Sequence, residues 1–146
     1  MTTDIRPIVV EATYAVDRST VWAAITDPER MSQWYFEPIA SFRPEVGFET
    51  QFTVRSQGKD WVHLWRVTEV VPESRIAYTF NYAGHEGDAS VLWEMLDVAG
   101  GTRLRLTHTG IGTYPKNEPA FQREMGVAGW TYFLQESLKG FLEPRG

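Results

Sequence analysis

Three histidines, His63, His85 and His108, are the side chains of this sequence best suited to metal binding or to proton transfer near neutral pH. No two of them stand at the spacing of a metal-ligand pair, and the sequence contains no His-Glu-x-x-His motif. The chain has no cysteine, which excludes thiolate catalysis, iron–sulfur clusters and cysteine-based zinc sites. The sequence therefore predicts no metal site and no cofactor.

Nucleotide and nucleic-acid binding are also not expected. Gly100-Gly101 is typical of a hairpin turn, since no glycine fingerprint leading into a helix surrounds it. The sequence has no Gly-x-Ser-x-Gly elbow, the motif that carries the nucleophile of many serine hydrolases. With 14 basic and 19 acidic residues the net charge is −5 at pH 7, which disfavours contact with a phosphate backbone.

His108 is the strongest single candidate for chemistry. It alternates with Leu104 and Leu106, so the three side chains are expected on the inward face of one strand. There His108 could act as a general acid or base, or it could be a structural histidine bonded to the backbone or to a neighbouring hydroxyl. The structural role is favoured because no carboxylate is evidently placed to orient the ring. Tyr78 is a weaker candidate, whose hydroxyl could meet a polar ligand or be satisfied within the core.

Aromatic residues are the unusual part of the composition, with 6 Trp, 6 Tyr and 8 Phe. Many of them recur at alternating positions of predicted strands or at helical spacing near the C-terminus. They could fill a dry core, which the sequence alone favours, or line a groove for a planar apolar molecule. The side chains expected to line such a groove are Trp34, Phe48, Phe52, Trp65, Tyr78, Phe80, Trp93, Leu106, His108, Trp130 and Phe133.

Elements that could position these side chains follow from periodicity and from capping residues. Asp17 and Asp27 are expected to cap two short helices, the second of which starts at Pro28. The predicted elements are a strand over 5–16, helices over 18–26 and from 28 to near 35–38, strands from 47, over 61–71, over 76–82, around 91–95 and around 104–108, and a helix over about 118–142.

The last helix carries an apolar stripe that should cover one face of the sheet. Short turns join the strands, so the sheet is expected to be antiparallel and the domain to be α+β with two layers. The stripe is predicted to comprise Val127, Trp130, Phe133, Leu134, Leu138, Phe141 and Leu142.

Length and composition favour a single domain over residues 1–146. A chain of this size buries roughly 68–70% of its unfolded surface, which is enough to fold without a metal or a disulfide. The N-terminus lacks a basic region followed by an apolar one, and no apolar run approaches the ~18 residues of a membrane span. We therefore expect a cytoplasmic location and no membrane insertion.

Six short motifs, in this order, resemble the START-like (SRPBCC, helix-grip) superfamily, and within it the activator of heat-shock-protein-90 ATPase homologues. They lie in residues 21–34 (Val-Trp-x-x-Ile-Thr-Asp-Pro-Glu-x-Met-x-x-Trp), 46–48, 66–72, 75–80, 102–110 and 129–138. The resemblance implies a sheet of about seven antiparallel strands curved around the C-terminal helix, with two short helices after the first strand. It also implies an internal cavity for an apolar small molecule.

The resemblance leaves the function open, because one fold serves many functions. It implies most simply a carrier or sensor that binds a hydrophobic, planar small molecule without chemistry. The alternatives are a polyketide cyclase-like or lyase-like enzyme that uses His108 and Tyr78 on a carbonyl compound, and a chaperone-associated stress protein. The co-chaperones that name the group carry an additional chaperone-binding domain, for which 146 residues leave no room, so a chaperone partner is not the expected one. A homodimer is compatible with the resemblance.

A ligand inside such a cavity needs an entrance. We expect it between Trp34-Tyr35-Phe36 and the loop Gly110–Pro115, with Trp34 and Ile111 as gate residues. The alternative is that both residues only seal the end of the core. Gly126 and Gly129 could allow either a ligand or the sheet to approach the helix backbone closely.

Overall fold

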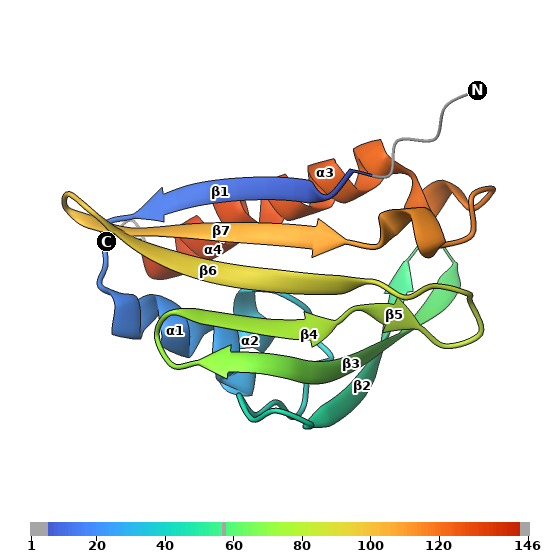
Figure 1. The fold of residues 1–146 in the computed structure, drawn as a ribbon, viewed down its shortest axis with the longest axis horizontal. Coiled ribbons are helices and arrows are strands. Elements are labelled where there is room, and N and C mark those ends of the chain that lie inside the picture. Colours follow the sequence, from blue (N-terminus) through green and yellow to red (C-terminus); the bar gives the residue numbers. More distant parts are fainter. Residues whose placement is uncertain (1–5, 57, 144–146) are drawn as a thin grey trace.

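A curved antiparallel sheet wraps around the C-terminal helical segment in the computed structural model, which describes residues 6–56 and 58–143 (Figure 1). The strand order is β1-β7-β6-β4-β3-β2, and β5 pairs with β3 beside this path. This is the seven-stranded helix-grip sheet that was expected. The strands are β1 (Ile8–Tyr14), β2 (Glu49–Ser56), β3 (Lys59–Val71), β4 (Arg75–Thr79), β5 (Asn81–Tyr82), β6 (Ser90–Val98) and β7 (Gly101–Thr109).

Two short helices follow β1 as predicted, α1 (Arg18–Thr26) and α2 (Pro28–Trp34). The Asp17 carboxylate accepts a hydrogen bond from the Thr20 amide at 3.0 Å, and the Asp27 carboxylate accepts one from the Glu29 amide at 3.1 Å. Both carboxylates thus satisfy amides that a helix start would otherwise leave open. The predicted first strand over 5–16 is shorter than expected, and its residue Ile5 lies outside the described residues.

The predicted strand over 76–82 is interrupted at Phe80. Before this residue β4 pairs with β3 and β6, whereas β5 after it pairs with β3. The Phe80 amide instead donates to the Ala89 carbonyl at 2.8 Å. A shift of register on β3 between Val67 and Glu69 adds to the bend of the sheet.

The C-terminal helix begins later than the predicted start near Glu118. A 3₁₀ turn, η1 (Ile111–Thr113), follows β7, and a second, η2 (Pro119–Phe121), precedes α3 (Arg123–Tyr132). The extended backbone of Gln122 separates η2 from α3. Helix α3 then passes through a π-helical turn, η3 (Phe133–Ser137), into α4 (Leu138–Leu142).

The apolar stripe predicted for this segment is buried or partly buried except at Val127, which is 39% exposed. Glycine and apolar residues spaced by four, Gly126, Trp130, Leu134 and Leu138, form the line that faces the sheet. Val127 follows Gly126 directly and is therefore rotated by about 100° toward solvent.

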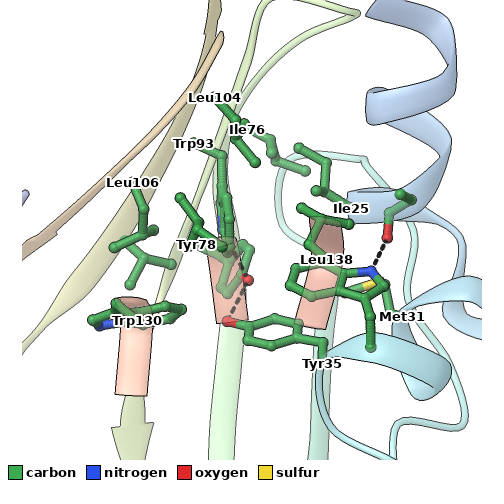
Figure 2. Packing of buried hydrophobic residues seen from close by; sticks show 14 of the residues in the cluster. Ile25, Met31, Tyr35, Ile76, Tyr78, Trp93, Leu104, Leu106, Trp130 and Leu138 are labelled. Atoms are coloured by element: carbon green, nitrogen blue, oxygen red, sulfur yellow. Dashed lines mark hydrogen bonds between the residues drawn. The ribbon is translucent and has the colours of Figure 1, made fainter. Parts of the chain in front are cut away.

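The core between the sheet and the helices is filled largely by aromatic rings. In Figure 2 the Tyr78 hydroxyl lies between Tyr35 and Trp93, at 3.1 Å from the Tyr35 hydroxyl and 3.1 Å from the Trp93 indole nitrogen. Leu104, Leu106 and His108 of β7 are buried on the same face, as their alternation predicted. The dry-core interpretation therefore holds for the middle of the sheet.

The π-helical turn is tied to β1 by a buried hydrogen bond. The Tyr14 hydroxyl donates to the Leu134 carbonyl at 2.6 Å, and both residues are fully buried. This bond joins the strand at one edge of the sheet to the helix that the sheet surrounds.

We expect Tyr14→Phe to lower the free energy of unfolding by about 1–3 kcal/mol, because it leaves the buried Leu134 carbonyl without this donor. Urea denaturation measures the loss. Tyr132→Phe is the matched control, since Tyr132 is 54% exposed. Equal stability of the two variants would show that the buried bond contributes nothing.

Candidate functional site

A cavity of about 160 Å³ lies between the start of α3 and the inward face of the sheet. Its walls include residues of η1 and η2, in the segment that joins β7 to α3 at one end of the molecule (Figure 1). An apolar cavity of roughly 150 Å³ holds a benzene-sized molecule. The space therefore suits one ring. Aromatic residues dominate its walls, which comprise Ile8, Phe36, Phe80, Tyr82, His108, Ile111, Tyr114, Ala120, Phe121, Gln122, Met125, Gly126, Gly129, Trp130 and Phe133.

The polar atoms at the back of this cavity form a chain of hydrogen bonds. The Trp130 indole nitrogen donates to His108 Nδ1 at 3.1 Å, and His108 Nε2 lies 3.1 Å from the Tyr114 hydroxyl. The Tyr114 hydroxyl donates in turn to the Phe80 carbonyl. An indole N–H can only donate, so Nδ1 is the acceptor and the neutral His108 ring carries its proton on Nε2.

Burial keeps this chain uncharged at neutral pH. It lowers the pKa of His108 to about 4 and raises the pKa of Tyr114 well above its usual value. A proton added to Nδ1 would face the Trp130 N–H, so the hydrogen bond also opposes protonation. Both ring nitrogens are engaged, and the geometry favours the structural role that the sequence suggested for His108.

Part of the predicted ligand-binding set lines the cavity, namely Phe80, His108, Trp130 and Phe133. The others pack in the core or at its edge without lining this cavity: Trp34, Phe48, Phe52, Trp65, Tyr78, Trp93 and Leu106. These residues do not border the cavity because their side chains pack against one another and leave no empty space between them. Trp93, for example, meets the edges of Trp34 and Tyr35 at ring-centroid distances of 6.1 and 5.8 Å.

Several wall residues come from irregular segments in which alternation carries no signal. Ile111, Tyr114 and Phe121 belong to the two 3₁₀ turns or lie beside them. Tyr114 is buried although it lies in a connection, because Gly87 lets its ring approach. A Cβ atom at Gly87 would lie 2.7 Å from the Tyr114 ring, and the positive φ of Gly87 also favours glycine. The glycines and proline of 110–115 were the sequence signal for this loop.

The entrance differs in part from the predicted one. Trp34 does not border the cavity; it is 2% exposed, and its indole nitrogen donates to the Ala24 carbonyl at 2.7 Å. Ile111 does line the cavity, as expected of a gate residue. Ala120 and Met125, the latter 51% exposed, are the exposed parts of the wall. The cavity therefore meets solvent beside η2 and the first turn of α3.

Two further findings concern other kinds of site. Within residues 6–56 and 58–143, no group of three or more His, Asp or Glu side chains is arranged to hold a metal ion. In the same part of the chain, no helix is both long and apolar enough to cross a membrane.

A curved antiparallel sheet around a C-terminal helix, with a ring-lined cavity between them, defines a helix-grip domain. The family described as Activator of Hsp90 ATPase homolog 1-like protein matches residues 15–143, and the chain belongs to this family. No curated protein matches the sequence at a significant level.

Solved structures show the same fold at low sequence identity. Protein CV1439 from Chromobacterium violaceum is 22% identical, with a TM-score of 0.78 over 96% of this chain and 99% of that one. DynU16, from the dynemicin biosynthetic locus, is 23% identical, with a TM-score of 0.74 over 97% of this chain and 48% of that one. The Aha1 dimer from Colwellia psychrerythraea is 19% identical, with a TM-score of 0.70 over 94% of this chain and 96% of that one.

Proposed function

We propose that this domain binds a hydrophobic, planar small molecule, with one ring of the molecule in the cavity, and holds it without chemical change as a carrier or sensor. The observation that carries the proposal is the ring-lined space of about 160 Å³ between α3 and the sheet. Its size matches a single aromatic ring, and its walls offer ring faces for stacking or edge contacts.

The lack of charge on the described walls supports an uncharged ligand. Among the described residues that line the cavity, none carries a formal charge at neutral pH. The Gln122 side-chain nitrogen donates to the Lys116 carbonyl at 2.8 Å and to the Glu118 carbonyl at 3.3 Å, within its own connection. A ring inside the cavity would therefore meet aromatic faces and polar groups that are already hydrogen-bonded, but no charged group, which suits an uncharged ring. The similar fold of a protein from a biosynthetic locus is consistent with a small-molecule role.

The geometry favours binding over the enzymatic alternative. An acid–base pair of His108 and Tyr78 would have to converge on one ligand, but Tyr78 does not line the cavity. Its hydroxyl is bonded to Tyr35 and Trp93, and both nitrogens of His108 are engaged. The proposal retains a cytoplasmic location and is compatible with a homodimer, the form in which the Aha1 protein of C. psychrerythraea was solved.

Gly129 allows a direct test. It lines the cavity, and a Cβ atom there would meet no atom within 4 Å, so Gly129→Leu would place a side chain in the empty space. Benzene at about 100 times its dissociation constant should stabilise the wild-type protein by ~2.7 kcal/mol. At ~2–4 °C per kcal/mol this raises the melting temperature by roughly 5–10 °C. We expect Gly129→Leu to abolish the shift.

Gly140→Leu is the matched control, because Gly140 is an exposed glycine of α4 with open space around its Cβ position. It should retain the full benzene-induced shift. Retention of the shift by Gly129→Leu, or its absence from the wild-type protein with benzene, toluene and indole alike, would contradict the proposal.

A further inference from the structure

The indole N–H of Trp65 is buried and has no hydrogen-bond partner, and it is the one such side-chain atom among the described residues. Trp65 is 2% exposed. The other described indoles that are at most 4% exposed are paired: Trp34 with the Ala24 carbonyl, Trp93 with the Tyr78 hydroxyl and Trp130 with His108. A buried donor without a partner costs free energy, so this exception calls for an explanation.

Trp65 lies one ring behind the cavity wall. Its ring centroid is 6.2 Å from that of Phe36 and 5.8 Å from that of Phe80, and both of these phenylalanines line the cavity. A ligand that replaced one of these two rings would come within reach of the indole. The unpaired donor and the cavity therefore belong to one region of the molecule.

Phe36 is the wall residue placed to move. It is half-buried and belongs to residues 35–48, a segment without helix or strand between α2 and β2. Long connections of this kind are the usual sites of functional rearrangement. The Phe36 carbonyl accepts a hydrogen bond from the Ile39 amide at 3.2 Å, within the same connection. Phe80 is tied to other elements at both backbone groups, since its amide donates to the Ala89 carbonyl and its carbonyl accepts from the Tyr114 hydroxyl.

We propose that a ligand with two or more fused rings displaces the Phe36 side chain and accepts a hydrogen bond from Trp65 Nε1. This inference rests on the proposed function and narrows its ligand to a class. The ligand is a fused aromatic compound that carries a hydrogen-bond acceptor, either a carbonyl oxygen or a ring nitrogen, about one ring away from the end buried in the cavity. The bond would give the Trp65 donor the partner that it lacks in the free protein.

Benzene, naphthalene and quinoline test the inference near pH 8. Benzene matches the cavity of about 160 Å³, whereas the two-ring compounds need the additional space. Naphthalene and quinoline share one shape and differ in a single acceptor nitrogen. We expect Trp65→Phe to lower the affinity for quinoline about 5-fold relative to the affinity for naphthalene, which is the effect of losing one hydrogen bond. Trp22→Phe in α1 is the control and should leave the ratio unchanged, because Trp22 does not line the cavity and contacts none of the rings that do.

The indole N–H resonances of the wild-type protein give a readout that does not depend on the stability of a variant. Quinoline should move the Trp65 N–H signal downfield, as expected for a new hydrogen bond, and naphthalene should not. Phe36→Leu should strengthen the binding of both two-ring compounds more than the binding of benzene, because it removes the ring that these compounds would otherwise have to displace.

The outcomes separate this inference from the proposed function. If none of the three compounds binds, the proposed function fails and the inference fails with it. If benzene alone binds, the Phe36 side chain is not displaced, and the inference is overturned while the proposed function stands. If both two-ring compounds bind but the quinoline-to-naphthalene ratio and the Trp65 N–H signal do not respond, the inference is likewise overturned.

Discussion

Lowering the pH from 7 to 4 is expected to remove about 3 kcal/mol of unfolding free energy for each of two buried histidines, His63 and His108. Burial lowers the pKa of both side chains to about 4. In the unfolded chain a histidine has a pKa of about 6.5. A difference of about 2.5 pKa units at ~1.4 kcal/mol per unit gives the expected loss.

The direction of the effect follows from proton uptake. Below pH 6.5 the unfolded chain binds a proton at each histidine, while the folded protein does not until about pH 4. This contribution to stability is therefore complete above pH 6.5, declines as the pH falls, and is lost below pH 4. The titratable rings that contact the two histidines are Tyr82 and Tyr114, which burial keeps neutral across this range, so they do not offset the loss.

Urea denaturation between pH 7 and pH 5 measures this effect above the range in which most carboxylates titrate. The free energy of unfolding should fall by about 2–3 kcal/mol per pH unit near pH 5 in the wild-type protein. His63→Gln and His108→Gln should each remove close to half of this slope, whereas His85→Gln, at an exposed position, should retain all of it. A wild-type stability that is flat over this range would show that the two histidines are not held neutral by the fold.

Local patterns predicted the parts of the fold that depend on local energetics. The alternation of Leu104, Leu106 and His108 and the capping by Asp17 and Asp27 are confirmed, since each depends on residues a few positions apart. The start of the last helix was misplaced because Pro119 suits the first turn of an α-helix as well as it suits a 3₁₀ turn. The π-helical turn carries no local signal, and its Leu134 carbonyl is bonded to Tyr14, which is 120 positions away in the sequence.

Alternation predicts which side chains point inward but not which of them border an empty space. Trp34, Tyr78 and Trp93 all face inward, but they pack against one another through a hydrogen bond and ring contacts and leave no cavity between them. The cavity depends instead on where the 3₁₀ turns lie, and the place of Tyr114 depends on a contact with Gly87 that no local pattern encodes. The resemblance to the helix-grip superfamily implied a cavity. Which residues of the connecting segments form its walls could be identified only from the structure.

Trp34→Ala is expected to destabilise the protein by about 3–5 kcal/mol, the usual cost of removing a buried tryptophan. The ring stacks on Tyr35 at 4.9 Å and meets the edge of Phe133 at 6.2 Å. The substitution also leaves the Ala24 carbonyl without the indole donor. Urea denaturation measures the loss, and Trp22→Ala on the preceding helix is the control, since Trp22 is only partly buried and should cost less.

The same variant separates a packing role from the gate role expected for Trp34. Because Trp34 lies outside the cavity wall, Trp34→Ala should leave the exchange rates of bound fluorobenzene unchanged, as measured by ¹⁹F line shapes under conditions in which the variant is folded. Ile111→Ala shortens the wall residue that was expected to act as a gate, and it should accelerate both association and dissociation, with little change in affinity. Faster exchange in Trp34→Ala at unchanged affinity would restore Trp34 to the entrance. Unchanged rates in Ile111→Ala would show that Ile111 does not act as a gate, and the exposed wall residues Ala120 and Met125 would then account for the opening alone.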